Sequence, residues 1–527
     1  MVMVSLSLQE DYWETFELQE EDVEFLYNYL LEQETPLTSQ ELLGALVQER
    51  IRREIEAIEK QRSAAGEIYL PRETYTHGQR LIFPALDWRQ GEVVGVRAGN
   101  NPDYPGLQVI KVRFDDNEER EFACGVADHP LNNPIPISQE EGIFDQDAIV
   151  RVYGDQLVER IEDGLRAHKD FVRIAGRWFP RALLVEINQG HLNLAEAVLD
   201  IAGGGPLATS ALLEQIELST TTNPKLVEFS LDLALEEDPR FDEVGPAGKV
   251  LWYLRRLEPE EVRETPLHLR YQEIEIDRQL LNDEMLALER ELDDELSLLE
   301  NRSRQEDEVV VRLIYPHWRV GSLPLSSRLR HLFPTAYEAP RIRFILTDQE
   351  SGEQFPGWVV REKRYVFGLW QWYQHHGLMP GSLVRVQRGK KPGEVLISVD
   401  KRRASREWIR TVLVGSDGGI VYAMLKQIVT AAYDERMAIA VPDVEALDQV
   451  WQRIQKERPS FERLVVNTAR ELTKLNPQGH VHASELYSAI NIIRRCPPAP
   501  LFALLASRPG FVHVGDLHFR FVDSETA

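Results

Sequence analysis

One pattern occurs three times in this chain and limits the folds that are open to it. In each copy a helix-like stretch ends at a polar break, a Phe opens a short strand, and the chain turns back through small residues to an aromatic. The copies run from Phe171 to Trp178, from Phe241 to Trp252 and from Phe511 to Phe519. Because strands separated by Gly and polar turn residues pair as hairpins, each copy predicts a helix followed by a two-stranded β-hairpin.

A second pattern precedes these hairpins. A short turn leads to residues that can cap a helix at 35–43, at 205–213 and, more loosely, at 479–487. A side-chain oxygen at such a position accepts a hydrogen bond from a free helix amide. A helix, a capped second helix and a terminal hairpin form a winged helix-turn-helix unit. We therefore predict three such units, the first of them split by a domain-sized insertion.

The insertion into the first unit is rich in β-strand patterns. Short alternating segments at 78–84, 91–96, 109–114 and 120–122 are separated by turns of Gly, Asn and Asp. Such a series is typical of a small barrel. We expect an inserted barrel of the SH3 type.

Residues 271–308 are predicted to form one long acidic helix. An apolar stripe repeats at spacings of three and four, as in a coiled coil. Its members are Leu281, Met285, Leu288, Leu292, Leu296 and Leu299. Two interpretations remain open: a helix packed on its own neighbours, or an arm for dimerisation or for another protein partner.

Charge limits where the chain can contact nucleic acid. The net charge is −26, whereas DNA affinity comes largely from Lys and Arg that displace phosphate counterions. Residues 341–403 are the exception, because they hold twelve basic and six acidic residues. The predicted nucleic-acid-binding residues of this basic domain are Arg341, Arg343, Arg361, Lys363, Arg364, Arg385, Arg388, Lys390 and Lys391. The alternative is that this basic face complements the chain's own acidic helices.

Signals of catalysis are weak. The Gly-rich stretch 415–419 lacks both the Gly-Lys-Ser/Thr of a phosphate loop and a G-x-S-x-G elbow. Four histidines, at 480, 482, 513 and 518, match no common zinc spacing. We therefore expect no enzyme activity, no catalytic residues, no cofactor and no metal site.

The cellular location follows from what the sequence lacks. Two cysteines far apart, Cys124 and Cys496, fit a reducing compartment. The first residues carry no basic region and no cleavage signal. No apolar run approaches the ~18 residues of a membrane span. A cytoplasmic protein without membrane contact is expected.

The fold class expected is α+β and multidomain. The predicted boundaries are 18–66 with 146–186 for the first winged-helix unit, 74–126 for the inserted barrel, 188–258 for the second unit, 268–308 for the acidic arm, 309–404 for the basic β-barrel, 405–457 for a mostly helical connector, and 458–524 for the third unit.

Two segments resemble modules of transcription proteins. The second unit resembles the HARE-HTH winged-helix family, which includes the N-terminal domain of the bacterial RNA polymerase delta subunit, through Gly205-Pro206-Leu207, Phe241 to Val244, and Trp252. The inserted barrel is similar to the Tudor-like domains of CarD-type polymerase-binding proteins and UvrD-type helicase tails, through Gly78, Gly91 to Val93, and Val112 to Phe114. These resemblances imply a transcription- or chromatin-associated adaptor.

A third segment, 341–400, resembles the DNA-binding pseudobarrel of plant auxin-response factors and of some restriction enzymes. The matching features are Trp358, the aromatic stretch 369–373 and the segment 378–386. The chain departs from the family at Ser382, where the family has an acid. The resemblance implies DNA binding by this domain.

The function expected is that of a non-enzymatic, transcription-associated DNA-binding factor. Its basic barrel would contact DNA, and its winged helices would hold protein partners, RNA polymerase among them. A homodimer through 271–308 is a further expectation. The alternatives are a protein-interaction scaffold without nucleic-acid binding, and an accessory subunit of a DNA-processing or defence system.

Overall fold

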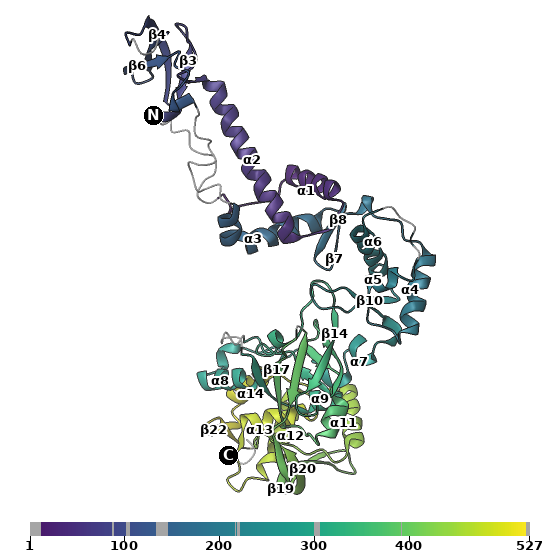
Figure 1. Ribbon diagram of the computed structural model, residues 1–527. Coiled ribbons are helices and arrows are strands. Elements are labelled where there is room, and N and C mark those ends of the chain that lie inside the picture. The colour runs from purple at the N-terminus through teal and green to yellow at the C-terminus, as the bar shows by residue number, and fades with distance from the viewer. Residues whose placement is uncertain are drawn as a thin grey trace. The chain divides into compact units, whose positions relative to one another are not determined.

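The computed structural model of the chain describes residues 12–86, 89–101, 106–132, 146–216, 218, 222–299, 306–391 and 393–522, with backbone alone for 57–65. Within these ranges the fold is mixed α and β, with 14 α-helices and several separate sheets (Figure 1). The contacts divide the chain into two units. The first holds the residues up to Arg173 together with Arg177–Leu184, and the second holds the rest.

The first unit contains three long helices and a small sheet. The helices are α1 (Glu20–Gln33), α2 (Ser39–Ala65) and α3 (Gln146–Ala167), and the strands, in sheet order, are β1 (Leu37–Thr38), β8 (Arg177–Pro180) and β7 (Phe171–Ile174). Thr38 begins α2 as expected, because its hydroxyl accepts the Glu41 amide (3.2 Å) and Glu41 accepts the Thr38 amide (2.7 Å).

The insertion between α2 and α3 forms a five-stranded sheet. Its strands lie in chain order: β2 (Glu67–Ile68), β3 (Arg80–Phe83), β4 (Arg89–Ala98), β5 (Gln108–Phe114) and β6 (Glu119–Cys124). An aromatic core holds it, in which the ring centroids of Phe83 and Phe122 lie 4.3 Å apart. The β-rich insertion is confirmed, while its likeness to Tudor-like barrels stays a prediction.

The second unit begins with another set of helices and a small sheet. These elements are α4 (Gln189–Ile201), β9 (Leu207–Ala208), α5 (Thr209–Leu213), α6 (Pro224–Glu236), β10 (Phe241–Glu243) and β11 (Leu251–Leu254), with the sheet order β10-β11-β9. Trp252 is fully buried here, and its indole N–H donates to Asp232 (2.9 Å) and Thr209 (3.2 Å).

The buried carboxyl of Asp232 makes this region sensitive to pH. Burial raises the pKa of Asp232 to about 7, so the folded state holds a proton that the unfolded chain releases above its ordinary pKa of about 4. This group's contribution to stability is therefore greatest below pH 4 and falls, by up to about 4 kcal/mol, as the pH rises to 7.

We expect the Asp232→Asn variant to lose less local stability than the wild type between pH 5 and pH 8. Asn keeps an acceptor for Trp252 but cannot ionise. Burial also raises the pKa of Glu243, to about 8. Because Glu243 still titrates in the variant, the pH dependence of local stability becomes smaller but does not disappear. Hydrogen exchange of peptides from α6 and β11, with the intrinsic pH effect removed, measures this. An unchanged pH dependence in the variant would contradict the assignment.

The C-terminal part repeats the same arrangement. It consists of α12 (Phe461–Thr473), β21 (Val481–His482), α13 (Ala483–Asn491), α14 (Pro498–Ser507), β22 (Phe511–Gly515) and β23 (His518–Phe521), with the sheet order β21-β23-β22. In all three copies the short strand before the second helix pairs with the second strand of the hairpin. The expected side-chain caps are present at α2 and α13, but the one expected at 205–213 is wrong, because Ala208 stands at the N-cap of α5 and the Thr209 hydroxyl donates to Asp232. The three predicted hairpins are confirmed. We call these sets the first, second and third repeat units.

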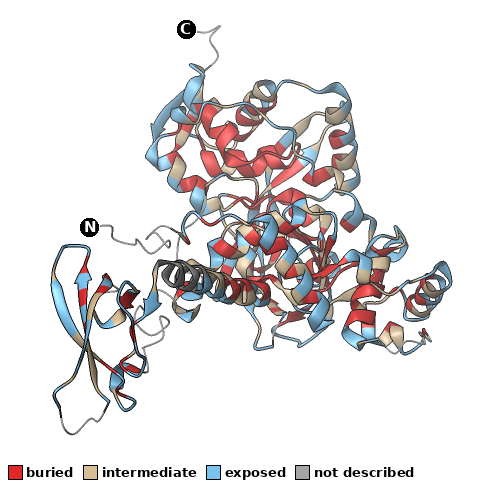
Figure 2. Cartoon of the chain, turned by 90° about the horizontal axis from the view of Figure 1, so that it is seen from above, coloured by how far each residue is buried: buried red, intermediate tan, exposed pale blue. Residues whose placement is uncertain are grey.

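A seven-stranded, nearly closed and barrel-like sheet separates the second and third repeat units in the sequence. In sheet order its strands are β12 (Glu308–Arg312), β17 (Leu383–Arg388), β18 (Glu394–Ser398), β14 (Arg341–Asp348), β15 (Gln354–Val360), β16 (Tyr365–Phe367) and β13 (Ser322–Pro324). The helices α7 (Glu260–Arg263), α9 (Tyr315–Val320) and α10 (Trp370–His375) accompany it. Buried residues fill the interior, where the sheet meets the C-terminal helices (Figure 2).

The prediction of one long helix over 271–308 is wrong. Helix α8 covers only Asp283–Leu292, between an Asn282 cap and a left-handed Asp293 (φ 48°). Residues 300–305 lie outside the described ranges. The acids at 293–295 oppose continuation, because negative charge is unfavourable at a helix C-terminus. Leu281, Met285 and Leu288, the start of the apolar stripe, are buried in the chain's own core, so this seam is not free for a second copy.

The prediction of a mostly helical connector at 405–457 is also wrong. Two long strands, β19 (Lys401–Val414) and β20 (Ile420–Ala431), form an antiparallel ribbon, and helix α11 (Val444–Glu457) follows. The Gly-rich stretch 415–419 is the turn between the strands. β-branched residues are frequent on both sides of it, in Ile409, Thr411 and Val412 and in Ile428 to Thr430, which favours strands over helix.

Candidate nucleic-acid interface

Two of the predicted basic residues are held by the second repeat unit. Arg341 pairs with Asp242 (3.0 Å) and Glu258 (2.8 Å), and its side chain is 12% exposed. The guanidinium of Arg343 lies over the ring of Tyr253, 5.7 Å from its centroid. Burial lowers the pKa of Arg343. The Arg341 charge is therefore neutralised within the chain, and Arg343 is half-buried against a ring.

Four other predicted arginines also have partners inside the chain. Three of them donate to backbone carbonyls: Arg361 to Ala339 (2.8 Å), Arg364 to Glu295 (3.2 Å) and Arg388 to His331 (2.6 Å). Arg385 pairs with Glu308 and with Asp400 (3.0 Å). These contacts hold turns and strand ends in place.

The three predicted lysines are exposed. Lys363 pairs with its neighbour Glu362 at 2.5 Å. Lys390 and Lys391 lie in the turn between β17 and β18, and neither forms an ion pair with any residue that the structure describes. The nine predicted residues therefore do not form one free basic face, and Lys390 and Lys391 are its clearest exposed part.

The ribbon of β19 and β20 presents a second basic surface, which sequence reasoning missed. Its antiparallel register places Arg406 opposite Ile428 and Trp408 opposite Lys426. Met424 lies on the same face, because side chains two residues apart on a strand point the same way. We call Arg406, Trp408, Met424, Lys426 and Ile428 the ribbon face.

The ribbon face is unusually exposed for its composition. The exposed fractions are 61% for Trp408, 66% for Ile428 and 41% for Met424, and Arg406 and Lys426 are exposed as well. The ammonium of Lys426 lies 5.3 Å from the centroid of the Trp408 ring. A large aromatic left open beside cations marks a recognition surface more often than a structural one.

The charge of the ribbon is strongly positive. Its strands carry six basic residues and one acid, Glu407. Glu407 accepts hydrogen bonds from Tyr433 and from Ser405 (2.8 Å), and it lies on the face opposite Trp408. Arg402 packs over the Tyr433 ring, 5.3 Å from its centroid. Neither Arg406 nor Lys426 forms an ion pair with any residue that the structure describes, whereas Arg410, opposite Met424 on the same side of the ribbon, pairs with Glu485.

Contacts at the turn end hold the ribbon firmly. The hydroxyl of Tyr422 donates to the Ala489 carbonyl (3.2 Å), and Arg410 pairs with Glu485 (2.8 Å), both on α13. Arg453 on α11 donates to the Asp417 carbonyl (3.3 Å) in the turn. The exposed face is thus presented on a fixed scaffold.

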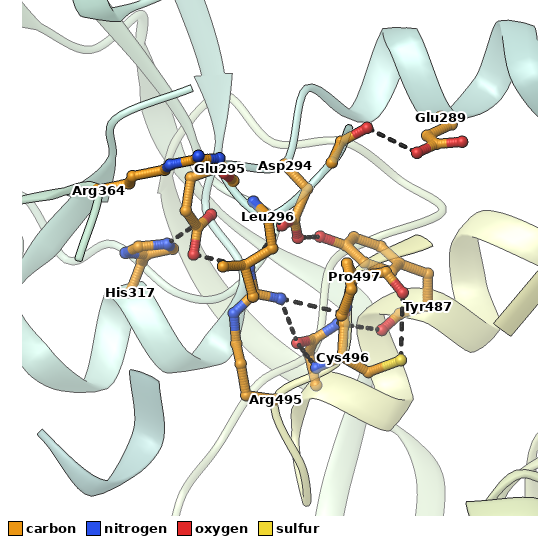
Figure 3. Close-up of polar contacts among 12 residues, drawn as sticks. Glu289, Asp294, Glu295, Leu296, His317, Arg364, Tyr487, Arg495, Cys496 and Pro497 are labelled. Carbon is orange, nitrogen blue, oxygen red and sulfur yellow. Dashed lines mark hydrogen bonds and ion pairs between the residues drawn. The ribbon is translucent and has the colours of Figure 1, made fainter. Parts of the chain in front are cut away.

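A buried polar cluster lies around Arg495, in the second of the two compact units (Figure 3). The guanidinium of Arg495 pairs with Asp294 (2.6 Å) and Glu295 (2.7 Å). Tyr487 donates to Asp294 (2.5 Å), and His317 lies 3.2 Å from Glu295. Figure 3 shows these groups converging from three segments of the chain. None of the five side chains is more than about one-twentieth exposed.

This cluster has the character of a structural tie. Burial, together with the adjacent Glu295, raises the pKa of Asp294, although Arg495 opposes the rise. Burial works in the same direction on Glu295, but Arg495 and His317 outweigh it and hold its pKa well below the usual value. The adjoining cavity of about 20 Å³ has room for one water.

One histidine of the third repeat unit caps a helix. His482 caps α13, where its ring accepts the Ser484 amide (3.1 Å), and burial lowers its pKa to about 4. Within the described ranges no three His, Cys, Asp or Glu side chains are placed to hold a metal ion.

Comparisons leave the family open. The chain matches no protein-family model, no curated protein and no solved structure. Its described helices include none with the length and apolar content needed to cross a lipid bilayer. The three resemblances drawn from the sequence stay predictions.

Sequence signals for the ribbon face were present. Within 401–414, Arg406, Trp408 and Arg410 alternate with other residues. The segment 420–431 is rich in β-branched and apolar residues, and Gly-Ser-Asp-Gly-Gly separates the two segments. That combination is a hairpin signature. Trp408 and Lys426 are 18 residues apart in sequence, so only a paired register brings them together.

Proposed function

We propose that this chain is a non-enzymatic DNA-binding protein whose ribbon face contacts duplex DNA. The carrying observation is an exposed, basic and aromatic two-stranded ribbon in a chain of net charge −26. A two-stranded ribbon fits the major groove, which is about 12 Å wide. Arg406 and Lys426 would contact phosphates, and Trp408 would pack on sugars or base edges.

The acidic remainder of the chain supports one binding orientation. Surfaces of net negative charge repel the phosphate backbone, and the ribbon face attracts it. Lys390 and Lys391 are proposed as an auxiliary contact. Arg402 and Arg403 extend the same positive charge toward the start of β19.

The repeat units are proposed to be winged helices that bind protein partners. In the second and third repeat units the helix before the hairpin is mostly buried, and the side chains of Leu231 and Leu501 have zero exposure. In the first, Arg160 donates to the Phe16 carbonyl (2.5 Å) and Arg166 pairs with Glu162 (2.9 Å). These helices offer little to a DNA groove, so an association with transcription proteins is the proposed use.

One observation favours the alternative of a pure scaffold. Arg341 and Arg385, two predicted DNA contacts, pair with carboxylates of the chain itself. A scaffold would use its basic groups in this way throughout. The exposed ribbon face is the feature that a scaffold without nucleic acid leaves unexplained.

The salt dependence of duplex binding distinguishes the DNA-binding protein from the scaffold. We expect a fluorescent 20-base-pair duplex to bind, with affinity falling about 100-fold between 50 and 200 mM salt if about four phosphate contacts form. The same strand in single-stranded form should bind more weakly, because the proposal places the ribbon in a groove. Absence of duplex binding at 50 mM salt would contradict DNA binding and favour the scaffold. Stronger single-strand binding would overturn the groove placement.

A further inference from the structure

A cavity of about 250 Å³ lies where α11 ends and α12 begins. Arg270, Gln272 and residues 493–495 complete its wall. Four arginines are among the lining residues, and no Asp or Glu is. In a chain with 86 acidic and 60 basic residues, a cavity lined by arginines alone among charged residues points to an anionic occupant.

Three of these guanidinium groups lack carboxylate partners. No ion pair with any residue in the described part of the chain is formed by Arg270, Arg458 or Arg494. Arg494 lies over the ring of Phe461, 5.6 Å from its centroid. Arg270 donates its Nε to the Thr265 carbonyl (2.7 Å), which leaves its terminal amino groups for another acceptor.

Arg495 adds a further donor to the wall. It also lines the cavity, and it is fully buried with its Nε lacking any hydrogen-bond partner. A buried unpaired donor is costly unless something accepts from it. Its terminal amino groups hold Asp294 and Glu295, as described above.

The start of α12 supplies the remaining donors. Ser460 caps this 13-residue helix by accepting the Arg463 amide (3.3 Å), and both Ser460 and Phe461 line the cavity. Glu462, an acid in the first turn of α12, is paired with Arg508 (2.8 Å). Free helix amides and the helix dipole favour an anion at this end.

We propose that this cavity binds the phosphate group of a small phosphorylated ligand. Arg458 and Arg494 would clamp the phosphate oxygens, because guanidinium groups match that geometry in a bidentate way. The Phe461 ring and the wall around Trp451 would take the organic part. At about 250 Å³ the cavity is smaller than the roughly 300–1,000 Å³ of pockets for drug-sized ligands, so a mononucleotide is near the upper limit.

Calorimetric titration of the full chain with inorganic phosphate and with adenosine monophosphate tests this. We expect saturable binding of both at millimolar or lower concentration, and weakening by at least about tenfold in the Arg458→Gln/Arg494→Gln variant, since charge-assisted bonds are lost. Tighter binding of the nucleotide than of phosphate would identify a phosphomonoester as the ligand, and equal binding would identify free phosphate.

Matched controls keep the outcome clear. Arg463→Gln removes an exposed charge from the same helix outside the cavity, and it should bind phosphate as the wild type does. Arg458 is exposed, so Arg458→Gln alone should fold normally and still lose affinity. No phosphate or nucleotide binding by the wild type, or full binding by both cavity variants, would overturn the proposal. DNA binding should be unchanged in these variants, which separates this site from the ribbon face.

Discussion

Replacing Arg495 with Met should cost about 3–5 kcal/mol of stability, because it leaves Asp294 and Glu295 buried without their cation. Arg495 is fully buried, and the two carboxylates are at most 5% exposed as side chains. The tie joins the segment after α8 to the third repeat unit, some 200 residues away in the chain. The variant should therefore lose hydrogen-exchange protection in both regions together.

The triple variant Arg495→Met/Asp294→Asn/Glu295→Gln should recover much of that loss. Removing a whole buried ion cluster is often nearly neutral, whereas removing one partner is not. Thermal or urea unfolding of the full chain compares them. Arg520→Met, at an exposed position of β23, is the control and should lie within about 0.5 kcal/mol of the wild type. An Arg495→Met protein as stable as this control would show that the cluster is no tie.

Reversing two charges on the ribbon face, in Arg406→Glu/Lys426→Glu, should lower duplex affinity about 100-fold or more at low salt. Two phosphate contacts are lost, and two like charges then face the backbone. The slope of log K against log salt should flatten by about 2. Anisotropy with the same duplex at several salt concentrations measures both quantities.

The matched control changes the net charge equally at another place. Lys225→Glu/Lys249→Glu reverses two exposed lysines of the second repeat unit and should leave affinity and slope near those of the wild type. Equal losses in both variants would mean that net charge alone governs binding. Trp408→Ala should also weaken binding without changing the slope, because an aromatic contact displaces no counterions.

Local sequence patterns predicted local structure correctly at several places in this chain. The Phe241–Trp252 and Phe511–Phe519 hairpins and the capped start of α2 at Thr38 depend on turns, caps and alternation within a few residues, and they appear as expected. The same reasoning failed at 271–308. A stripe at helical spacing also suits a short helix whose apolar residues enter the core. Asp294 and Glu295, which follow α8, pair with Arg495 and do not extend the helix.

The candidate interface shows the limit more sharply. The composition of 341–403 pointed to a basic domain, but composition could not say which of its basic side chains are free of partners within the chain. Arg341 is held by Glu258 and Arg388 by the His331 carbonyl, partners that lie 83 and 57 residues away. The ribbon face lay in a segment expected to be helical, so its pairing of Trp408 with Lys426 was out of reach.

The sequence by itself determined the three hairpins, the β-rich insertion and the position of the basic region, because turns, caps and alternation act between near neighbours. The tertiary structure alone decided which charges remain exposed. Whether a guanidinium group forms an ion pair with a carboxylate or remains unpaired and exposed depends on packing between segments that are distant in the sequence. The threefold repeat could thus be predicted from local patterns, whereas the exposed ribbon of β19 and β20 between its last two copies, the surface that we propose for DNA, depended on the tertiary structure.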